Sequence, residues 1–142
     1  MRARLIDGSE RAGTWLLAFE AGDDVLAALR DFAREHAIGA ASFQAIGAFR
    51  SATVAFYDVA AQRYEDHIVD EQVEVCSLLG NVTRFDGDVR IHAHVVLGRR
   101  DLTTLGGHLV RAEVNPTLEL FLQVSDATLD RTLDPPSALP LL

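Results

Sequence analysis

The sequence predicts an α+β domain with a largely antiparallel sheet of seven to eight strands and one main helix. One stretch, about residues 23–38, repeats apolar side chains at three- and four-residue spacing, which is typical of an amphipathic helix. Most of the remaining chain consists of short runs rich in Val, Phe, Tyr and Leu, separated by Gly, Asn and Pro. Because several of these runs follow one another without an intervening helix, antiparallel pairing is expected.

The composition is that of a globular protein with a single domain, residues 1–142. The chain has 142 residues, of which 49% are hydrophobic and 24% are charged, and this length is sufficient for one hydrophobic core. No apolar run approaches the roughly 20 residues that cross a bilayer, so no membrane partner is expected. Cys76 is the single cysteine, which excludes a disulfide within the chain and favours a cytoplasmic location.

The charge balance argues against nucleic acid as a partner. The formal net charge is −8, with only 13 Lys and Arg residues, whereas nucleic-acid-binding domains carry basic patches that displace counterions from phosphates. The densest basic pair is Arg99-Arg100. An anionic ligand could bind there, but solvated loop charges are the better interpretation.

Two stretches before the helix are predicted to be extended. Residues 1–13 are polar and contain glycine, which indicates an arm or an edge strand. Thr14–Phe19 is a short apolar run that begins with β-favouring residues, so a strand is expected there. Trp15, the only tryptophan, is expected in the core.

The stretch of about residues 23–38 has the start and stop signals of a helix. Asp23 is placed to cap its N-terminus, because its carboxylate can accept hydrogen bonds from the free amides of the first turn. Gly39 fits the left-handed residue that follows a helix, and His36 lies where the helix dipole favours positive charge. The apolar stripe consists of Val25, Leu29, Phe32, Ala33 and His36.

The chain after this helix is predicted to be mostly strands. Ala40–Phe49 and Ala52–Asp58 are expected to be two strands, arranged around Gly47 and Arg50-Ser51. Tyr64–Asp70 is a mixed stretch with no clear period.

A β-hairpin is expected from residues 73–84 and 89–98, because Asp86–Asp88 between them is a turn signal. Strict alternation along Val73–Leu79 would keep its odd-numbered residues on one face. Cys76 then lies on the other face, where we expect a buried, small apolar residue.

The last part of the chain is predicted to pair with this hairpin and then leave the sheet. Residues 107–114 form the next strand, and Asn115-Pro116 makes a turn into residues 118–124. The Pro-rich tail, residues 134–142, is expected to leave the sheet, and its terminal leucines suggest that it docks on a neighbour.

Three of the five histidines lie in one short region, and two of them share a strand. His92 and His94 are two residues apart, so on a strand both imidazoles lie on the same face, while Ala93 and Val95 face the core. Neutral imidazoles that converge from adjacent strands can form a transition-metal site with one open position. The same face could instead line a polar pocket that contains no metal.

His108 is the third candidate ligand, but simple pairing does not bring it to the other two. A loop centred near residue 102 would place His94 opposite residue 110. A bulge at Gly106-Gly107 could shift the register by the amount needed. Alternatively, the third ligand comes from another subunit.

An ordered set of motifs along the chain resembles that of a known domain family. The motifs are Ile46–Ala48, Ala52–Asp58, Glu74–Asn81, His92–Asp101, Gly106–Leu109 and Asn115–Leu120. Together they resemble the plants-and-prokaryotes conserved (PPC) domain over a core of about residues 14–126. The resemblance implies a sheet-rich α+β fold that assembles as a homotrimer, and zinc held by the His-x-His and Gly-Gly-His motifs. These motifs correspond to His92, His94 and His108.

The chain departs from the family pattern in three places. It has no Arg-Gly-Arg core of an AT-hook, so the DNA-binding role of the plant members does not transfer. The plant motif Gly-Arg-Phe-Glu-Ile-Leu corresponds to Glu71–Cys76, where only Glu74 is kept. Asp101-Leu102 stands where Asp-Gly is common, so a different turn geometry is expected.

Three functions are compatible with these residues and motifs. The first is a homotrimer that binds zinc through the three histidines and takes a small-molecule ligand or a protein partner. The second is a metal-dependent enzyme on a small molecule, with no catalytic residue assigned. The third is a DNA-binding or regulatory protein, which the charge disfavours. For the enzyme, the candidate general bases are Glu74, Glu113, Asp101 and His67.

Overall fold

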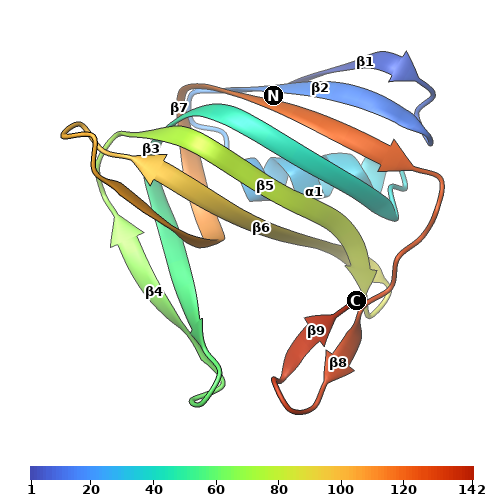
Figure 1. Cartoon of the computed structure of the whole chain (residues 1–142). Coiled ribbons are helices and arrows are strands. Elements are labelled where there is room, and N and C mark those ends of the chain that lie inside the picture. Colours follow the sequence, from blue (N-terminus) through green and yellow to red (C-terminus); the bar gives the residue numbers. More distant parts are fainter.

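A seven-stranded antiparallel sheet carries the single helix, α1 (Val25–Glu35), on one face (Figure 1). This computed structural model describes residues 1–142. The strands of the sheet are β1 (Arg2–Gly8), β2 (Gly13–Glu20), β3 (Ala40–Asp58), β4 (Arg63–Val69), β5 (Val73–Phe85), β6 (Asp88–Gly98) and β7 (Thr104–Ser125). The predicted mixture of one helix and a largely antiparallel sheet is therefore confirmed.

The sheet folds back on itself because its two longest strands each pair with three others. The strand order is β1-β2-β7-β6-β5-β3-β4, with a further pairing of β7 with β3. The pairs β3–β5, β5–β6, β6–β7 and β7–β3 consequently form a closed ring. The edge strands are β1 and β4, which confirms the extended arm expected for residues 1–13.

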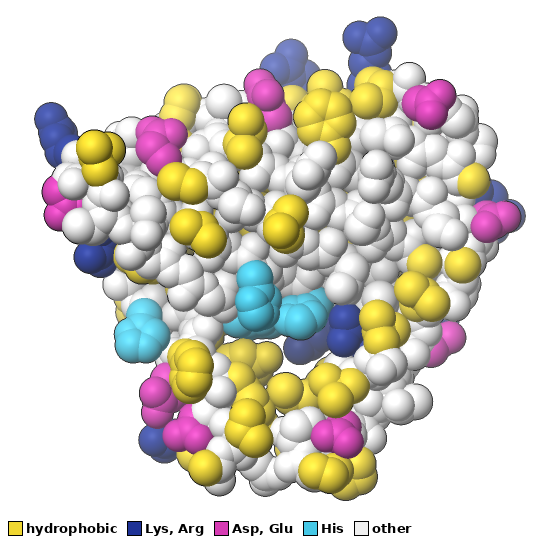
Figure 2. Space-filling model, viewed as in Figure 1, with side chains coloured by type: hydrophobic (Ala, Val, Ile, Leu, Met, Phe, Trp, Pro, Cys, Tyr) yellow, Lys and Arg dark blue, Asp and Glu magenta, His cyan; other side chains and the backbone are white.

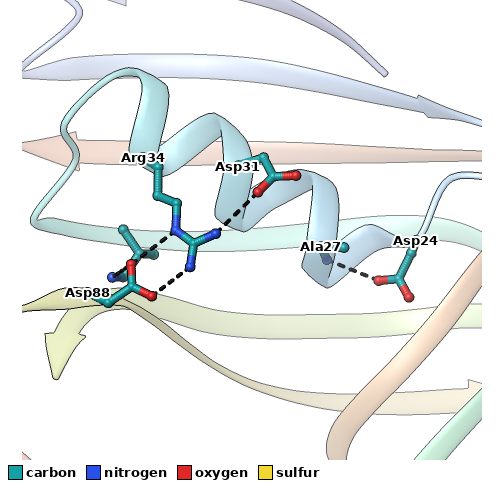
Figure 3. A network of polar contacts seen from close by, with 6 residues as sticks. Asp24, Ala27, Asp31, Arg34 and Asp88 are labelled. Carbon is teal, nitrogen blue, oxygen red and sulfur yellow. Dashed lines mark hydrogen bonds and ion pairs between the residues drawn. The ribbon is translucent and has the colours of Figure 1, made fainter. Parts of the chain in front are cut away.

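Helix α1 packs its apolar stripe on the sheet, but its ends differ from those expected. The side chain of Asp24, not Asp23, accepts the capping hydrogen bond, from Ala27 N at 3.0 Å (Figure 3). Asp23 instead accepts from Glu20 N and pairs with the N-terminal amine. The helix residues that are buried in the core are Val25, Leu26, Leu29, Phe32 and Ala33.

The expected left-handed role of Gly39 is wrong. Ala37 has the positive φ, 51°, after the helix end. Gly39 instead packs closely against Thr128, where a Cβ would lie 2.8 Å from Oγ1. His36 caps the C-terminus of the helix and packs on Trp15 and Phe32. Trp15 is buried, as predicted.

One ion pair ties the end of the helix to the hairpin of β5 and β6 (Figure 3). Arg34 donates to both carboxylate oxygens of Asp88, at 3.0 and 2.6 Å. This bidentate hydrogen bonding is the main cause that lowers the pKa of Asp88 to about 2. The expected turn between the two strands is present, with positive φ at Asp86 and Gly87.

Two predicted breaks turn out to lie inside continuous strands. The expected pair of strands around Gly47 is the single strand β3, which bends through several register shifts. Gly47 lies at one shift, where a Cβ would come within 2.3 Å of Thr117 O. Asn115-Pro116 likewise lies within β7, at the place where β3 skips its pairing between Val114 and Leu118. Pro116 has no amide to donate, so this gap in the ladder accommodates it.

A bulge in β5 changes the expected faces of that strand. The register shifts between Val75 and Ser77, so Val75 and Leu78 are both buried while Leu79 is 56% exposed. Cys76 lies at the bulge and is exposed. Its predicted burial is therefore wrong, because strict alternation does not hold through a bulge.

The tail leaves the sheet, as expected, and forms a small hairpin of its own, β8 (Thr132–Asp134) and β9 (Leu139–Leu141). Arg84 N donates to Leu129 O, and Arg131 N donates to Arg84 O, which fixes the start of the hairpin to the end of β5. No helix in the structure combines the length and the apolar character that a membrane crossing requires.

Candidate metal centre

Strand β6 presents His92 and His94 on the face of the sheet opposite to the core. Their neighbours Ile91, Ala93 and Val95 are buried, so the alternation of the strand directs both imidazoles away from the core, as predicted. The Nε2 atoms of the two histidines lie 3.2 Å apart.

His108 lies on β7 directly opposite His94 within the same chain. The loop from Gly98 to Thr104 is centred on residue 101, so the pairing is regular and no bulge occurs between the two strands. The expectation that His94 would face residue 110 is therefore wrong. The five-residue loop is closed by two backbone hydrogen bonds, Arg99 N to Thr103 O and Leu102 N to Arg99 O.

The glycines before His108 allow three strands to come close together. A Cβ on Gly106 would lie 2.7 Å from Val95 O of β6, and one on Gly107 would lie 2.7 Å from Ala55 O of β3. Contacts this short exclude any side chain. Of the two roles expected for these glycines, close packing is the one observed.

The three histidines form a cluster of the size that one metal ion needs. One potential ligand atom from each of His92, His94 and His108 lies within 4.8 Å of the other two. Zn–N bonds of about 2.0–2.1 Å in a tetrahedron place two nitrogens about 3.3 Å apart, and the His92–His94 separation is already close to this value.

The surroundings of His92 and His108 favour neutral imidazoles. Burial, followed by the charges of the other two histidines, lowers the pKa of His108 to about 4. Burial is also the main cause that lowers the pKa of His92. Metal ligation requires the unprotonated ring. Nδ1 of His108 is buried and has no hydrogen-bond partner, so a metal bound at this atom would supply the missing interaction.

A cleft of about 60 Å³ opens beside the cluster. It is lined by Tyr64, Arg90, Ile91, His92, His108, Arg131, Leu139, Pro140 and Leu141. In Figure 2, histidine side chains lie at the rim of a hollow near the centre of the face, with basic side chains beside them. The C-terminal hairpin therefore supplies part of the wall of this cleft.

The tip of β3 and β4 closes the other side of the hollow. Tyr57 Oη donates to Ser137 O, and Gln62 Nε2 donates to Pro136 O at 2.8 Å. The ring of Tyr64 stacks near His108, with ring centroids 4.9 Å apart. The tail thus docks on its own chain.

Sequence reasoning missed Tyr64, Arg90 and Arg131 as neighbours of the histidines. Tyr64 reaches His108 because β4 pairs with β3 and β3 pairs with β7, whereas the mixed stretch from Tyr64 to Asp70 was not predicted to be a strand. Arg131 reaches the cluster from a tail of polar and Pro-rich sequence. The predicted docking concerned residues 134–142 on a neighbour, so it did not point to Arg131.

The candidate general bases do not gather at the histidines. Glu74, Glu113, Asp101 and His67 are absent from both the cluster and the lining of the cleft. Glu113 pairs with Arg50 at 3.4 Å, and Asp101 accepts hydrogen bonds from Thr103 in the loop. The cleft therefore contains no carboxylate.

The basic pair lies at the hairpin tip, away from the histidine cleft. Arg99 pairs with Glu71 at 3.0 Å, and Arg100 is exposed in the loop. Neither residue lines the cleft.

The fold and the site together define the class of protein. It is a small, sheet-rich α+β domain whose candidate metal site consists of three histidines on two adjacent strands. The family model of the Plants and Prokaryotes Conserved (PCC) domain matches residues 7–126. The chain therefore belongs to this family, the one that its motifs resemble.

Solved structures share the fold over nearly the whole chain. A metal-containing protein from Archaeoglobus fulgidus is 33% identical with a TM-score of 0.84, and the match covers 99% of this chain and 97% of that one. A plant- and prokaryote-conserved protein from Pyrococcus horikoshii is 27% identical with a TM-score of 0.84, covering 91% and 90%. A protein from Bacteroides thetaiotaomicron, whose description proposes DNA binding, is 26% identical with a TM-score of 0.90, covering 98% and 95%. No functionally curated protein matched the chain.

Proposed function

We propose that this protein is a homotrimer that binds one zinc ion per chain through His92, His94 and His108, and that it takes a small ligand or a protein partner at this site. The observation that carries the proposal is the convergence of three imidazoles with one potential ligand atom each inside 4.8 Å. The Archaeoglobus relative, described as metal-containing, supports it. Cys76, the lone cysteine of this chain, suits a cytoplasmic location.

Zinc is the proposed metal because of the donor set. Three neutral histidines with a fourth, open position are a usual zinc environment. A bound zinc ion would act as a Lewis acid toward whatever occupies that position. The protein's own contribution is to favour the neutral rings of His92 and His108 by partial burial and to fix the spacing of the histidines through the regular pairing of β6 with β7.

Zinc titration followed by calorimetry tests the proposal. We expect one zinc per chain, and X-ray absorption of the loaded protein should give three nitrogen ligands at about 2.0–2.1 Å. Absence of saturable zinc binding would contradict the proposal.

The trimer is supported by an apolar patch on the outer face of the sheet. Ile46, Leu79 and Phe121 are 61%, 56% and 41% exposed and border one groove across β3, β5 and β7. Apolar side chains gathered on a surface in this way mark interaction sites. Leu79→Glu should dissociate the trimer in native mass spectrometry, whereas Leu102→Glu, on the exposed hairpin loop, should not. A monomeric wild-type protein would contradict this part of the proposal.

DNA binding is the second candidate, because the description of the Bacteroides structure proposes it. This weighs against the expectation that nucleic acid is not a partner. The net charge of −8 opposes it. A gel shift at low salt distinguishes the candidates: a shift that weakens as salt rises would favour DNA binding, and no shift at low salt would exclude it.

A further inference from the structure

Arg131 is held rigidly at the edge of the histidine cleft by neutral groups. Its Nε donates to Thr83 Oγ1 at 2.8 Å, Nη2 donates to Asn81 Oδ1 at 2.9 Å, and Nη1 donates to Pro140 O at 3.0 Å. Thr83, the one fully buried polar side chain of the chain, therefore serves to position this guanidinium. Of the five N–H donors of arginine, two remain free, one on each terminal nitrogen.

The positive charge of Arg131 has no acidic partner. Neither Arg131 nor the neighbouring Arg90 forms a salt bridge with a carboxylate. Burial, followed by the charge of Arg90, lowers the pKa of Arg131. A partly buried cation without a counterion carries a desolvation cost. The chain has a net charge of −8, yet none of its carboxylates pairs with Arg131.

The cleft between this guanidinium and the histidines is small, and every side chain that lines it is either basic or uncharged. Its volume of about 60 Å³ is far below the ~300 Å³ or more of pockets for drug-sized ligands. Two arginines and two histidines line it, and no Asp or Glu does. These features select a small anion over a nucleotide or a peptide.

We propose that the cleft binds a small oxyanion, a carboxylate or a phosphate, which spans from the histidine cluster to Arg131. The inference rests on the proposed function and names the ligand class of that site. The oxyanion would meet the metal on one side and the two free guanidinium N–H groups on the other. Guanidinium donors match carboxylate and phosphate oxygens in geometry and charge.

The test uses full-length protein loaded with Co²⁺, whose visible absorption reports on its ligands. Phosphate and acetate are titrated separately, with sodium chloride at equal ionic strength as the reference, so that the two sources of an oxyanion are distinguished. We expect a saturable spectral change with at least one of them. Arg131→Gln should weaken that binding by ~10-fold or more, because charge-assisted hydrogen bonds are lost, while the metal content stays unchanged.

Arg84→Gln is the matched control. Arg84 joins the same tail to β5 and pairs with Asp130, but it does not line the cleft, so its loss should leave anion affinity unaltered. If Arg131→Gln does not fold, Arg131→Lys replaces it. Lysine keeps the positive charge but lacks the paired N–H donors of the guanidinium, so this variant should also bind the anion more weakly.

The outcomes separate this inference from the metal proposal. Metal uptake with equal anion affinity in wild type and Arg131→Gln would overturn the inference alone. If no metal binds, the proposed function fails, and ³¹P NMR of phosphate with the metal-free protein then decides. Binding that depends on Arg131 would support the anion site, and its absence would overturn it.

Discussion

The two faces of the sheet differ in how they are built. The face under α1 is apolar. Leu29, Phe32 and the strand side chains below them are buried together, and Nε1 of Trp15 is a buried side-chain nitrogen there that has no hydrogen-bond partner. The opposite face carries the three histidines, and the cleft beside them is lined by two arginines and by no Asp or Glu. We infer that stability is concentrated on the first face and binding on the second, so substitutions on the two faces should have separable effects.

The largest expected effect is on the stability of the apolar face. Leu29 is fully buried in the helix–sheet contact, and Leu29→Ala should lower the free energy of unfolding by ~2–5 kcal/mol through lost burial and a residual cavity. Urea denaturation measures this change. Zinc affinity of the folded fraction should be unchanged, and a parallel loss of zinc affinity would show that the faces are not separable.

The next effect is on the histidine face. His92→Ala removes a proposed ligand and should weaken zinc binding by more than the ~10–100-fold that is typical when only a hydrogen-bond partner of a ligand is lost, measured by competition with a chromophoric chelator. The metal-free protein should keep its stability. His67→Ala is the control, because His67 is exposed on β4 and outside the cluster. Equal effects of the two variants would refute the assignment.

The metal-free protein should be sensitive to acid through His108. The pKa of His108 is about 4 in the folded state against 6.5 for the free side chain, because burial disfavours the charged ring. Between these values the unfolded chain binds more protons, so stability should fall as pH decreases from 6.5 to about 4 and this contribution should then level off. His108→Ala should flatten that part of a pH series of urea denaturations. An unchanged slope would contradict the assignment.

The smallest effect concerns the exposed ion pair at the edge of the apolar face. The pKa of Asp88 is lowered to about 2 from 3.8, so its contribution to stability is complete above 3.8 and is lost as pH falls toward 2. Asp88→Asn should remove this pH dependence and leave zinc binding unaltered. Thermal melts across this range measure it, and an identical acid profile in wild type and variant would show that the pair with Arg34 contributes nothing.

The sequence predicted what depends on local patterns and missed what depends on long-range pairing. The helix, the β5–β6 hairpin and the shared face of His92 and His94 follow from periodicity and turn residues. Whether His94 lies opposite His108 depends on which residue is at the centre of the five-residue loop between β6 and β7. The spacing of the residues did not determine that centre. The bulge at Cys76 has no local signal, and the approach of Arg131 depends on where the tail docks.

The most direct test of the central claim is the metal content of untagged protein purified without chelators. Elemental mass spectrometry should find near-stoichiometric zinc in the wild-type chain and loss of zinc in both His92→Ala and His94→Ala. No metal in any preparation, even after incubation with excess zinc, would contradict the account, and the histidines would then line a polar cleft that binds without metal.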